Sequence, residues 1–158
     1  MLHLLYAVLH DEMDETFEDY LPYGINHYEV MFFYVPVLIE QNGTWTKYPA
    51  QTCILYAPNQ YVHYKAASGK LLYDWIRFDC DEPFFTDTFI PFGQPFTCYN
   101  HQDFYSYWQL IAHENIAGYR TRDYVLNQLM LILLYRLHDY ALQYSPTPYQ
   151  DSLITLRN

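Results

Sequence analysis

The feature that most constrains the fold is the segment at residues 52–78, which carries the signals of three strands in close succession. Residues 53–57 are a short apolar run rich in strand-forming side chains, and the Pro-Asn-Gln sequence at residues 58–60 predicts a turn. Residues 61–65 alternate in polarity and lead into a loop at residues 66–70 that contains Ser-Gly. Three short strands joined in this way favour a small β-barrel.

The third strand of this segment is predicted over residues 71–79. Successive side chains of a strand point to opposite faces, so two aromatic rings and an arginine are expected on one side of the sheet. That side holds Leu71, Tyr73, Trp75 and Arg77, and the opposite side holds Leu72, Asp74, Ile76 and Phe78.

A hairpin is predicted earlier in the chain, at the Gln-Asn-Gly sequence of residues 41–43. The long run of β-branched and aromatic residues at 28–39 forms its first arm, and residues 44–48 return. Asn-Gly tolerates the positive φ angles that a two-residue turn requires. Pro36 has no N–H to donate to a strand ladder, so it predicts an edge, a bulge or a break in the first arm.

Acidic residues are concentrated between positions 11 and 19, after a first strand predicted over residues 2–9. Their spacing lacks the D-x-[DN]-x-[DN]-G pattern of a calcium loop, so a solvated loop is the favoured interpretation. Over the whole chain, eighteen acidic residues against eight basic ones give a net charge of −10. Without clustered lysines or arginines, the chain itself is not expected to bind DNA.

Around residue 100 the apolar period changes from two to 3.6, which predicts two helices. We expect Asn100 to cap the first helix and Gly118 to end it. The apolar face of this helix consists of Phe104, Tyr107, Trp108 and Ile111.

The second helix is predicted from Thr121 to the Ser-Pro sequence at residues 145–146. Its apolar residues extend beyond a single stripe, and a helix with two apolar faces packs against two partners. One partner is the barrel or the first helix. The second partner is either the rest of the same chain or another copy of it in a homodimer. The residues predicted for dimerisation are Leu126, Met130, Leu133 and Leu137.

The three cysteines, Cys53, Cys80 and Cys98, show no C-x-x-C spacing and are expected to be reduced thiols of a cytoplasmic protein. The chain opens with no signal-peptide pattern, and no apolar stretch is long enough to cross a bilayer. We therefore expect a soluble protein without a membrane partner.

Five residues of the 52–78 segment resemble the N-terminal effector-binding domain of AraC-type bacterial transcription regulators. In that family a Pro-containing turn and a His-Tyr pair precede a Trp-x-x-Phe strand, and the matching residues here are Pro58, His63, Tyr64, Trp75 and Phe78. The resemblance implies a mainly β fold with C-terminal helices, in which a cupin-like β-barrel (double-stranded jelly roll) spans residues 1–98 and a dimerising helical pair spans residues 99–145. Residues 146–158 would begin a linker to a DNA-binding helix-turn-helix domain outside this chain.

The resemblance also implies a small-molecule effector, expected to be a carbohydrate bound in the barrel without a cofactor. Aromatic rings suit the apolar faces of sugars, and polar side chains suit their hydroxyls. Tyr64 and Trp75 match the aromatics that contact the sugar in arabinose-responsive members, and Tyr73 stands where those members have a histidine. The family's sugar-anchoring arginine has no counterpart near residues 21–23, although Arg77 could replace it. The predicted ligand-binding residues are His63, Tyr64, Tyr73, Trp75 and Arg77.

Two other function classes stay open beside this one. A metal-dependent cupin enzyme would need a His-x-His pair with a nearby acid and a third histidine, and the sequence contains no His-x-His. Cys53 with His63 could form a nucleophile and its base, but a cysteine in an apolar strand is more often an inert small hydrophobe. The prediction is therefore that the chain is not an enzyme. The remaining alternative is a pure dimerisation module with a side-chain-filled barrel.

Overall fold

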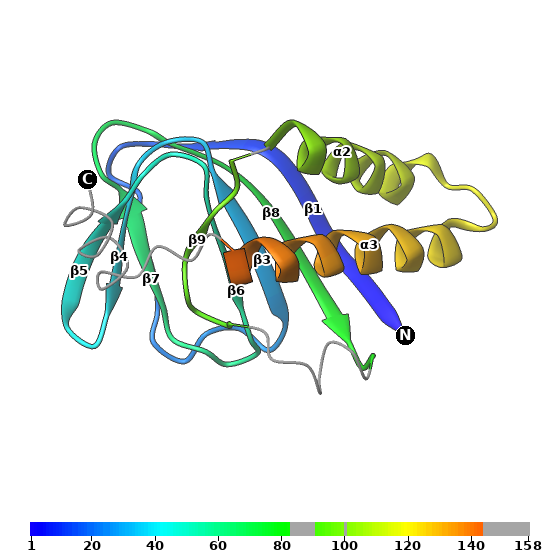
Figure 1. Ribbon diagram of the computed structural model, residues 1–158, viewed down its shortest axis with the longest axis horizontal. Coiled ribbons are helices and arrows are strands. Elements are labelled where there is room, and N and C mark those ends of the chain that lie inside the picture. Colours follow the sequence, from blue (N-terminus) through cyan, green and yellow to red (C-terminus); the bar gives the residue numbers. More distant parts are fainter. Residues whose placement is uncertain (83–90, 100, 144–158) are drawn as a thin grey trace.

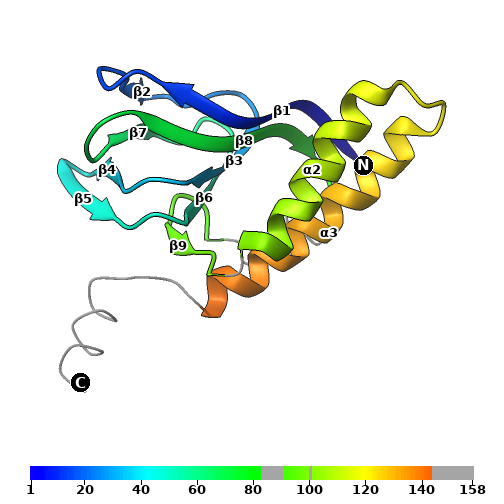
Figure 2. The same cartoon turned by 90° about the horizontal axis from the view of Figure 1, so that it is seen from above.

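The computed structural model describes residues 1–82, 91–99 and 101–143, which form three layers (Figures 1 and 2). Two antiparallel sheets pack face to face, and two helices cover the outer side of the larger sheet. The five-stranded sheet has the order β1-β8-β3-β6-β9, and the four-stranded sheet has the order β2-β7-β4-β5. This arrangement confirms the predicted fold class, a cupin-like β-barrel followed by a helical pair.

The larger sheet lies between the helices and the smaller sheet. Its strands are β1 (Leu2–Met13), β3 (Tyr28–Phe33), β6 (Thr52–Tyr56), β8 (Leu71–Cys80) and β9 (Phe96–Thr97). The smaller sheet consists of β2 (Asp19–Leu21), β4 (Val37–Gln41), β5 (Thr44–Tyr48) and β7 (Val62–Ala66). The helices are α2 (His101–Ala117) and α3 (Arg122–Gln143).

The predicted hairpin is confirmed between β4 and β5. Gln41 pairs with Thr44, so the turn has two residues, Asn42 with a φ of 54° and Gly43 with a φ of 83°. Positive φ at both positions is typical of the type I′ turn. Of the three effects predicted for Pro36, the structure shows a break in the strand. The chain leaves the larger sheet after β3 and enters the smaller sheet at β4.

The first strand differs from its prediction, because β1 extends into the acidic segment. Asp11 and Glu12 pair with β8 within the ladder and do not belong to a loop. They remain compatible with a strand because their carboxylates find partners there: Asp11 accepts a hydrogen bond from Trp75 Nε1 at 2.9 Å, and Glu12 lies 3.2 Å from Lys70 Nζ. Composition alone does not reveal such cross-strand partners.

Two separate cores hold the layers together, and β8 contributes to both. Tyr73 packs into the inner core between the sheets, whereas Ile76 and Phe78 pack into the outer core under the helices. The alternation predicted for this strand is thus confirmed. The inner core consists of Met31, Phe33, Val37, Ile39, Ile54, Tyr56, Val62, Tyr64, Leu71 and Tyr73.

A buried carboxylate, Asp74, links the larger sheet to the first helix. It is fully buried and accepts hydrogen bonds from the backbone N–H of His10 at 2.7 Å and from the Tyr34 hydroxyl at 2.5 Å. The His10 ring stacks on Tyr34 with centroids 4.8 Å apart, and its Nε2 lies 2.7 Å from the Tyr105 hydroxyl of α2. Burial, followed by the hydrogen bond to Asp74, raises the pKa of Tyr34.

The helices follow their predicted apolar stripes. Phe104, Trp108 and Ile111 of α2 are buried, and Gly118 adopts a φ of 72° just beyond the end of the helix. The predicted cap Asn100 and the predicted stop at residues 145–146 lie outside the described residues. The four α3 residues predicted for dimerisation all pack inside this chain's own outer core, so a helical dimer, which stays a prediction, would need another face. They are Leu126, Met130, Leu133 and Leu137.

Candidate functional site

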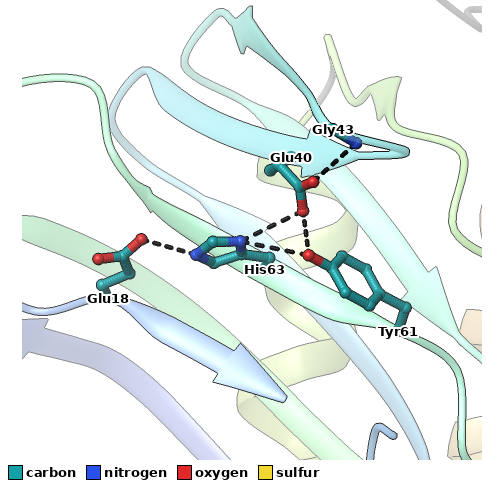
Figure 3. A network of polar contacts seen from close by, with 5 residues as sticks. All are labelled: Glu18, Glu40, Gly43, Tyr61 and His63. Carbon is teal, nitrogen blue, oxygen red and sulfur yellow. Dashed lines mark hydrogen bonds and ion pairs between the residues drawn. The ribbon is translucent and has the colours of Figure 1, made fainter. Parts of the chain in front are cut away.

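A network of polar side chains lies on the outer face of the four-stranded sheet, with His63 at its centre (Figure 3). His63 Nε2 is 2.6 Å from Glu18 Oε1, and His63 Nδ1 is 3.2 Å from Glu40 Oε2. Glu40 also accepts hydrogen bonds from the Tyr61 hydroxyl and from the backbone N–H of Gly43, the latter at 2.8 Å. One imidazole therefore joins two carboxylates that come from different strands or loops.

Strand alternation explains why these side chains meet outside the barrel. Val62 and Tyr64 of β7 point into the inner core, so His63 between them points outward. On the neighbouring β4, Ile39 points inward and Glu40 outward by the same rule. The hairpin turn then folds the Gly43 N–H back onto Glu40.

Aromatic rings flank the imidazole on both sides. The ring centroid of His63 lies 4.4 Å from that of Tyr20 on β2 and 4.5 Å from that of Trp45 on β5. Lys65 Nζ sits 4.6 Å above the Trp45 ring. Tyr20 is 55% exposed and Trp45 is 39% exposed, so both rings offer surface to solvent.

The hydrogen bond between Tyr61 and Glu40 shifts the pKa of both groups away from neutral pH. It is the largest cause that lowers the pKa of Glu40, assisted by the Gly43 N–H and by His63. The same bond raises the pKa of Tyr61 to about 12. At neutral pH the pair is a carboxylate that accepts a hydrogen bond from a protonated phenol.

A cleft of about 540 Å³ opens next to this pair, between the β4–β5 hairpin and the loop at residues 92–94. Gln41 Nε2 donates to the Gly93 carbonyl oxygen at 2.5 Å and ties the two sides together. Besides Glu40 and Tyr61, the cleft is lined by the ring of Phe92 and by several side-chain amides. The amide residues are Gln41, Asn42, Gln60 and Gln94.

The five residues predicted from the sequence to bind ligand do not share one pocket. His63 is in the outer network, whereas Tyr64 and Tyr73 are 1% and 5% exposed in the inner core. Their rings contact each other at 6.2 Å between centroids, and both contact Phe33. Burial is the main cause that raises the pKa of Tyr73 to about 12.

Trp75 and Arg77 are neighbours on one side of β8. Arg77 Nε and Nη2 are each 3.0 Å from Glu29 Oε2, and the guanidinium carbon is 5.3 Å from the centroid of the Trp75 ring. Glu29 is only 7% exposed, and burial raises its pKa while the attraction of Arg77 lowers it. Arg77 is thus paired with a buried carboxylate.

Sequence reasoning missed most of the outer network, namely Glu18, Tyr20, Glu40, Trp45 and Tyr61. The detectable signal was the alternation at residues 61–65, which places Tyr61 and Lys65 on the same side as His63. The hairpin register adds another, because a two-residue turn at positions 42 and 43 puts Glu40 opposite Trp45.

The described residues contain no cluster of three or more His, Cys, Asp or Glu side chains that could hold a metal ion. Cys53, Cys80 and Cys98 are all free thiols. Within the part of the chain that the structure describes, no helix is long and apolar enough to cross a membrane.

No protein-family model matches this chain, and no curated protein sequence matches it. Among solved structures, ToxT from Vibrio cholerae with a bound unsaturated fatty acid gives a TM-score of 0.45 at 9% identity. That match covers 91% of this chain and 55% of ToxT, so the chain spans about half the length of that protein.

Two further solved structures match about half of this chain. The cupin_2 domain of an XRE-family transcriptional regulator from Enterobacter cloacae gives a TM-score of 0.32 at 9% identity and covers 52% of this chain and 97% of that domain. An HTH_3-family transcriptional regulator from Vibrio cholerae gives a TM-score of 0.32 at 14% identity, and this match covers 51% of each chain. At these TM-scores the likenesses carry no argument about function, and the fold assignment rests on this chain's own strand order and helices.

Proposed function

We propose that this chain is the ligand-sensing domain of an AraC-type transcription regulator and that its effector is a neutral carbohydrate. The observation that carries the proposal is the cleft beside the Glu40–Tyr61 pair. The Tyr61 hydroxyl donates its proton to Glu40, so the carboxylate and the phenol oxygen both offer acceptor positions to the hydroxyl groups of a ligand.

The composition of the cleft suits such a ligand. Side-chain amides both donate and accept hydrogen bonds, as sugar hydroxyls do, and Phe92 offers a flat face for the C–H side of a sugar ring. A net charge of −10 disfavours an anionic effector but not a neutral one. The site proposed here is thus at the barrel's rim, whereas the sequence placed it in the interior.

The regulatory role supposes a cytoplasmic homodimer and a DNA-binding domain outside this chain. Effector binding would shift the population between two arrangements of the attached domains, by an amount set by the effector's differential affinity for them. In this proposal the chain performs no chemistry on its ligand, and DNA is contacted only by the other domain.

The test is a thermal-unfolding screen of the purified chain against monosaccharides and oligosaccharides. A ligand at one hundred times its Kd adds about 2.7 kcal/mol to the free energy of unfolding. For a domain of this size that corresponds to a rise of roughly 5 to 11 °C in Tm. The exposed Gln94 in the cleft supplies the binding variant Gln94→Ala, and the exposed Gln128 on α3 supplies the matched control Gln128→Ala.

A sugar-specific rise in Tm that Gln94→Ala reduces and Gln128→Ala retains would support the proposal. Parallel samples with divalent metals, with EDTA and with an unsaturated fatty acid, the ligand named for ToxT, test the other classes. A shift only with metal that EDTA reverses would favour an enzyme. A response only to the fatty acid would replace the carbohydrate with a lipid effector.

A second candidate function is a dimerisation module with no effector. It is favoured by the filled inner core, where Tyr64 and Tyr73 occupy the place in which the sequence predicted a pocket. A screen in which no ligand changes the Tm, together with a stable dimer in sedimentation analysis, would support this second candidate.

A further inference from the structure

The outer face of the four-stranded sheet carries a row of side chains that crosses all four strands. Tyr20 of β2 pairs with His63 of β7, and Glu40 of β4 pairs with Trp45 of β5. The two pairs are joined by the contact of 3.2 Å between His63 Nδ1 and Glu40 Oε2. The row therefore runs without interruption from Tyr20 to Trp45.

The side chains of this row lie closer together than the backbone spacing of its strands. The backbones of the four strands span three gaps of about 4.8 Å each, or roughly 14 Å along the sheet. Its two ends are aromatic and exposed, Tyr20 at 55% and Trp45 at 39%. The His63 ring lies between them, with its centroid 4.4 Å from that of Tyr20 and 4.5 Å from that of Trp45, so the three rings form one continuous surface.

The chemistry of the row alternates between flat rings and hydrogen-bonding groups. Tyr20 and Trp45 offer aromatic faces, and Glu18 and Glu40 place carboxylate oxygens beside the central imidazole. The two carboxylates outnumber the single lysine, Lys65 over the Trp45 ring, which disfavours an anionic ligand. A neutral chain with repeating apolar faces and hydroxyl edges fits this alternation.

The row is also continuous with the cleft, since Glu40 lines the cleft and stands within the row. Tyr61 makes the same connection, because its ring packs on Tyr20 with centroids 6.0 Å apart and its hydroxyl faces the cleft at Glu40. A ligand seated in the cleft would thus reach the aromatic row directly.

We propose that the effector is a linear oligosaccharide of at least two sugar units, one held in the cleft and the next stacked across the row on Tyr20 and Trp45. This inference rests on the proposed carbohydrate-sensing function and adds the length of the ligand and the residues that select it.

The experiment probes the purified chain on a glycan array of neutral hexose and pentose saccharides, from single units to hexasaccharides. Calorimetric titration then compares the best-binding glycan with its own monosaccharide. The variants are Tyr20→Ala and Trp45→Ala for the row, Gln94→Ala for the cleft, and Gln128→Ala as the control outside both. Trp45→Phe keeps a ring, and an unchanged Tm shows that each variant is folded.

We expect array binding only for glycans of two or more units. Trp45→Ala should weaken the affinity for the oligosaccharide by about three- to tenfold, the loss of one aromatic contact, and Trp45→Phe should restore most of it. Gln94→Ala should weaken binding of every glycan. If the monosaccharide binds as tightly as its oligomer and the row variants bind like the unaltered chain, the row is no subsite while the sensing function stands. Absence of binding to all glycans would overturn both proposals.

Discussion

Replacing Arg77 with methionine tests how the barrel tolerates a buried charge. Glu29 is 7% exposed, and both of its contacts to Arg77, at 3.0 Å, involve one carboxylate oxygen, Oε2. Methionine keeps most of the side-chain volume but leaves the Glu29 carboxylate without the guanidinium. The reverse variant, Glu29→Gln, leaves Arg77, whose side chain is 29% exposed.

The two variants should therefore differ in cost. Removing one partner of a buried ion pair costs about 3 to 5 kcal/mol, and the partial exposure of Arg77 places Arg77→Met at the lower end, about 3 kcal/mol. Glu29→Gln should cost about 1 kcal/mol, because Arg77 stays in contact with water and with the Trp75 ring. These losses correspond to Tm decreases of roughly 6 to 12 °C and 2 to 4 °C.

The same reasoning predicts the direction in which the stability of Arg77→Met changes with pH. Burial already raises the pKa of Glu29 in the folded protein above its ordinary value of 4.5, and Arg77 opposes the rise. Without Arg77 the folded-state pKa rises further, so the folded form holds its proton more tightly than the unfolded form. Stability of Arg77→Met should then fall as pH rises from the ordinary pKa through the raised one.

The assay is thermal unfolding of both single variants and of the double variant between about pH 4 and 8, where carboxylates titrate. The double variant should be more stable than Arg77→Met, because it carries no buried charge. If Glu29→Gln is as destabilising as Arg77→Met, or if the loss in Arg77→Met does not depend on pH, the buried carboxylate is not the cause.

Three further perturbations follow from single contacts. Gly24→Ala should destabilise the fold by more than about 2 kcal/mol in denaturant unfolding, because Gly24 has a φ of +64° and an added Cβ would lie 2.3 Å from a backbone oxygen. The control Gly69→Ala, at a φ of +67° with open space around it, should cost only about 1 kcal/mol. Equal losses of stability in the two variants would contradict the steric argument. Tyr34→Phe removes a hydroxyl that donates to the buried Asp74 and should cost about 1.5 to 3 kcal/mol by the same measurement; a neutral result would mean that Asp74 is satisfied without it. The folded-state pKa of Tyr73 is raised to about 12, so the contribution of the protonated Tyr73 side chain to stability is intact below pH 10 and is lost as pH rises through 12. A titration of tyrosinate absorbance should show an ionisation step near pH 12 that is missing in Tyr73→Phe. If the two titration curves are the same, the prediction is wrong.

Local signals in the sequence were enough to predict much of the fold. Asn42 and Gly43 fix a two-residue turn by their own backbone preferences, and Gly118 ends a helix for the same reason. The period-two pattern of β8 is likewise a property of neighbouring residues. These predictions succeeded because each depends on a few consecutive positions.

The candidate site depends on contacts that no local pattern contains. His63 meets Glu40 from 23 residues away and Glu18 from 45 residues away. Periodicity correctly groups Tyr73 with the side of β8 that faces the other sheet, yet it does not say whether that space is open. The packing of Phe33 and Tyr64 against Tyr73 fills it, and only the three-dimensional arrangement reveals this.

The exposed aromatic side chains on the outer face of the small sheet have a consequence for how such a protein can diverge. Substitutions at exposed positions away from caps and buried networks usually change stability by less than about 0.5 kcal/mol, whereas core substitutions cost several times more. Tyr20 and Trp45 stand on that exposed face, apart from both cores. Under the proposed function, substitutions at these two positions would change the preferred ligand while the barrel beneath them stays unchanged.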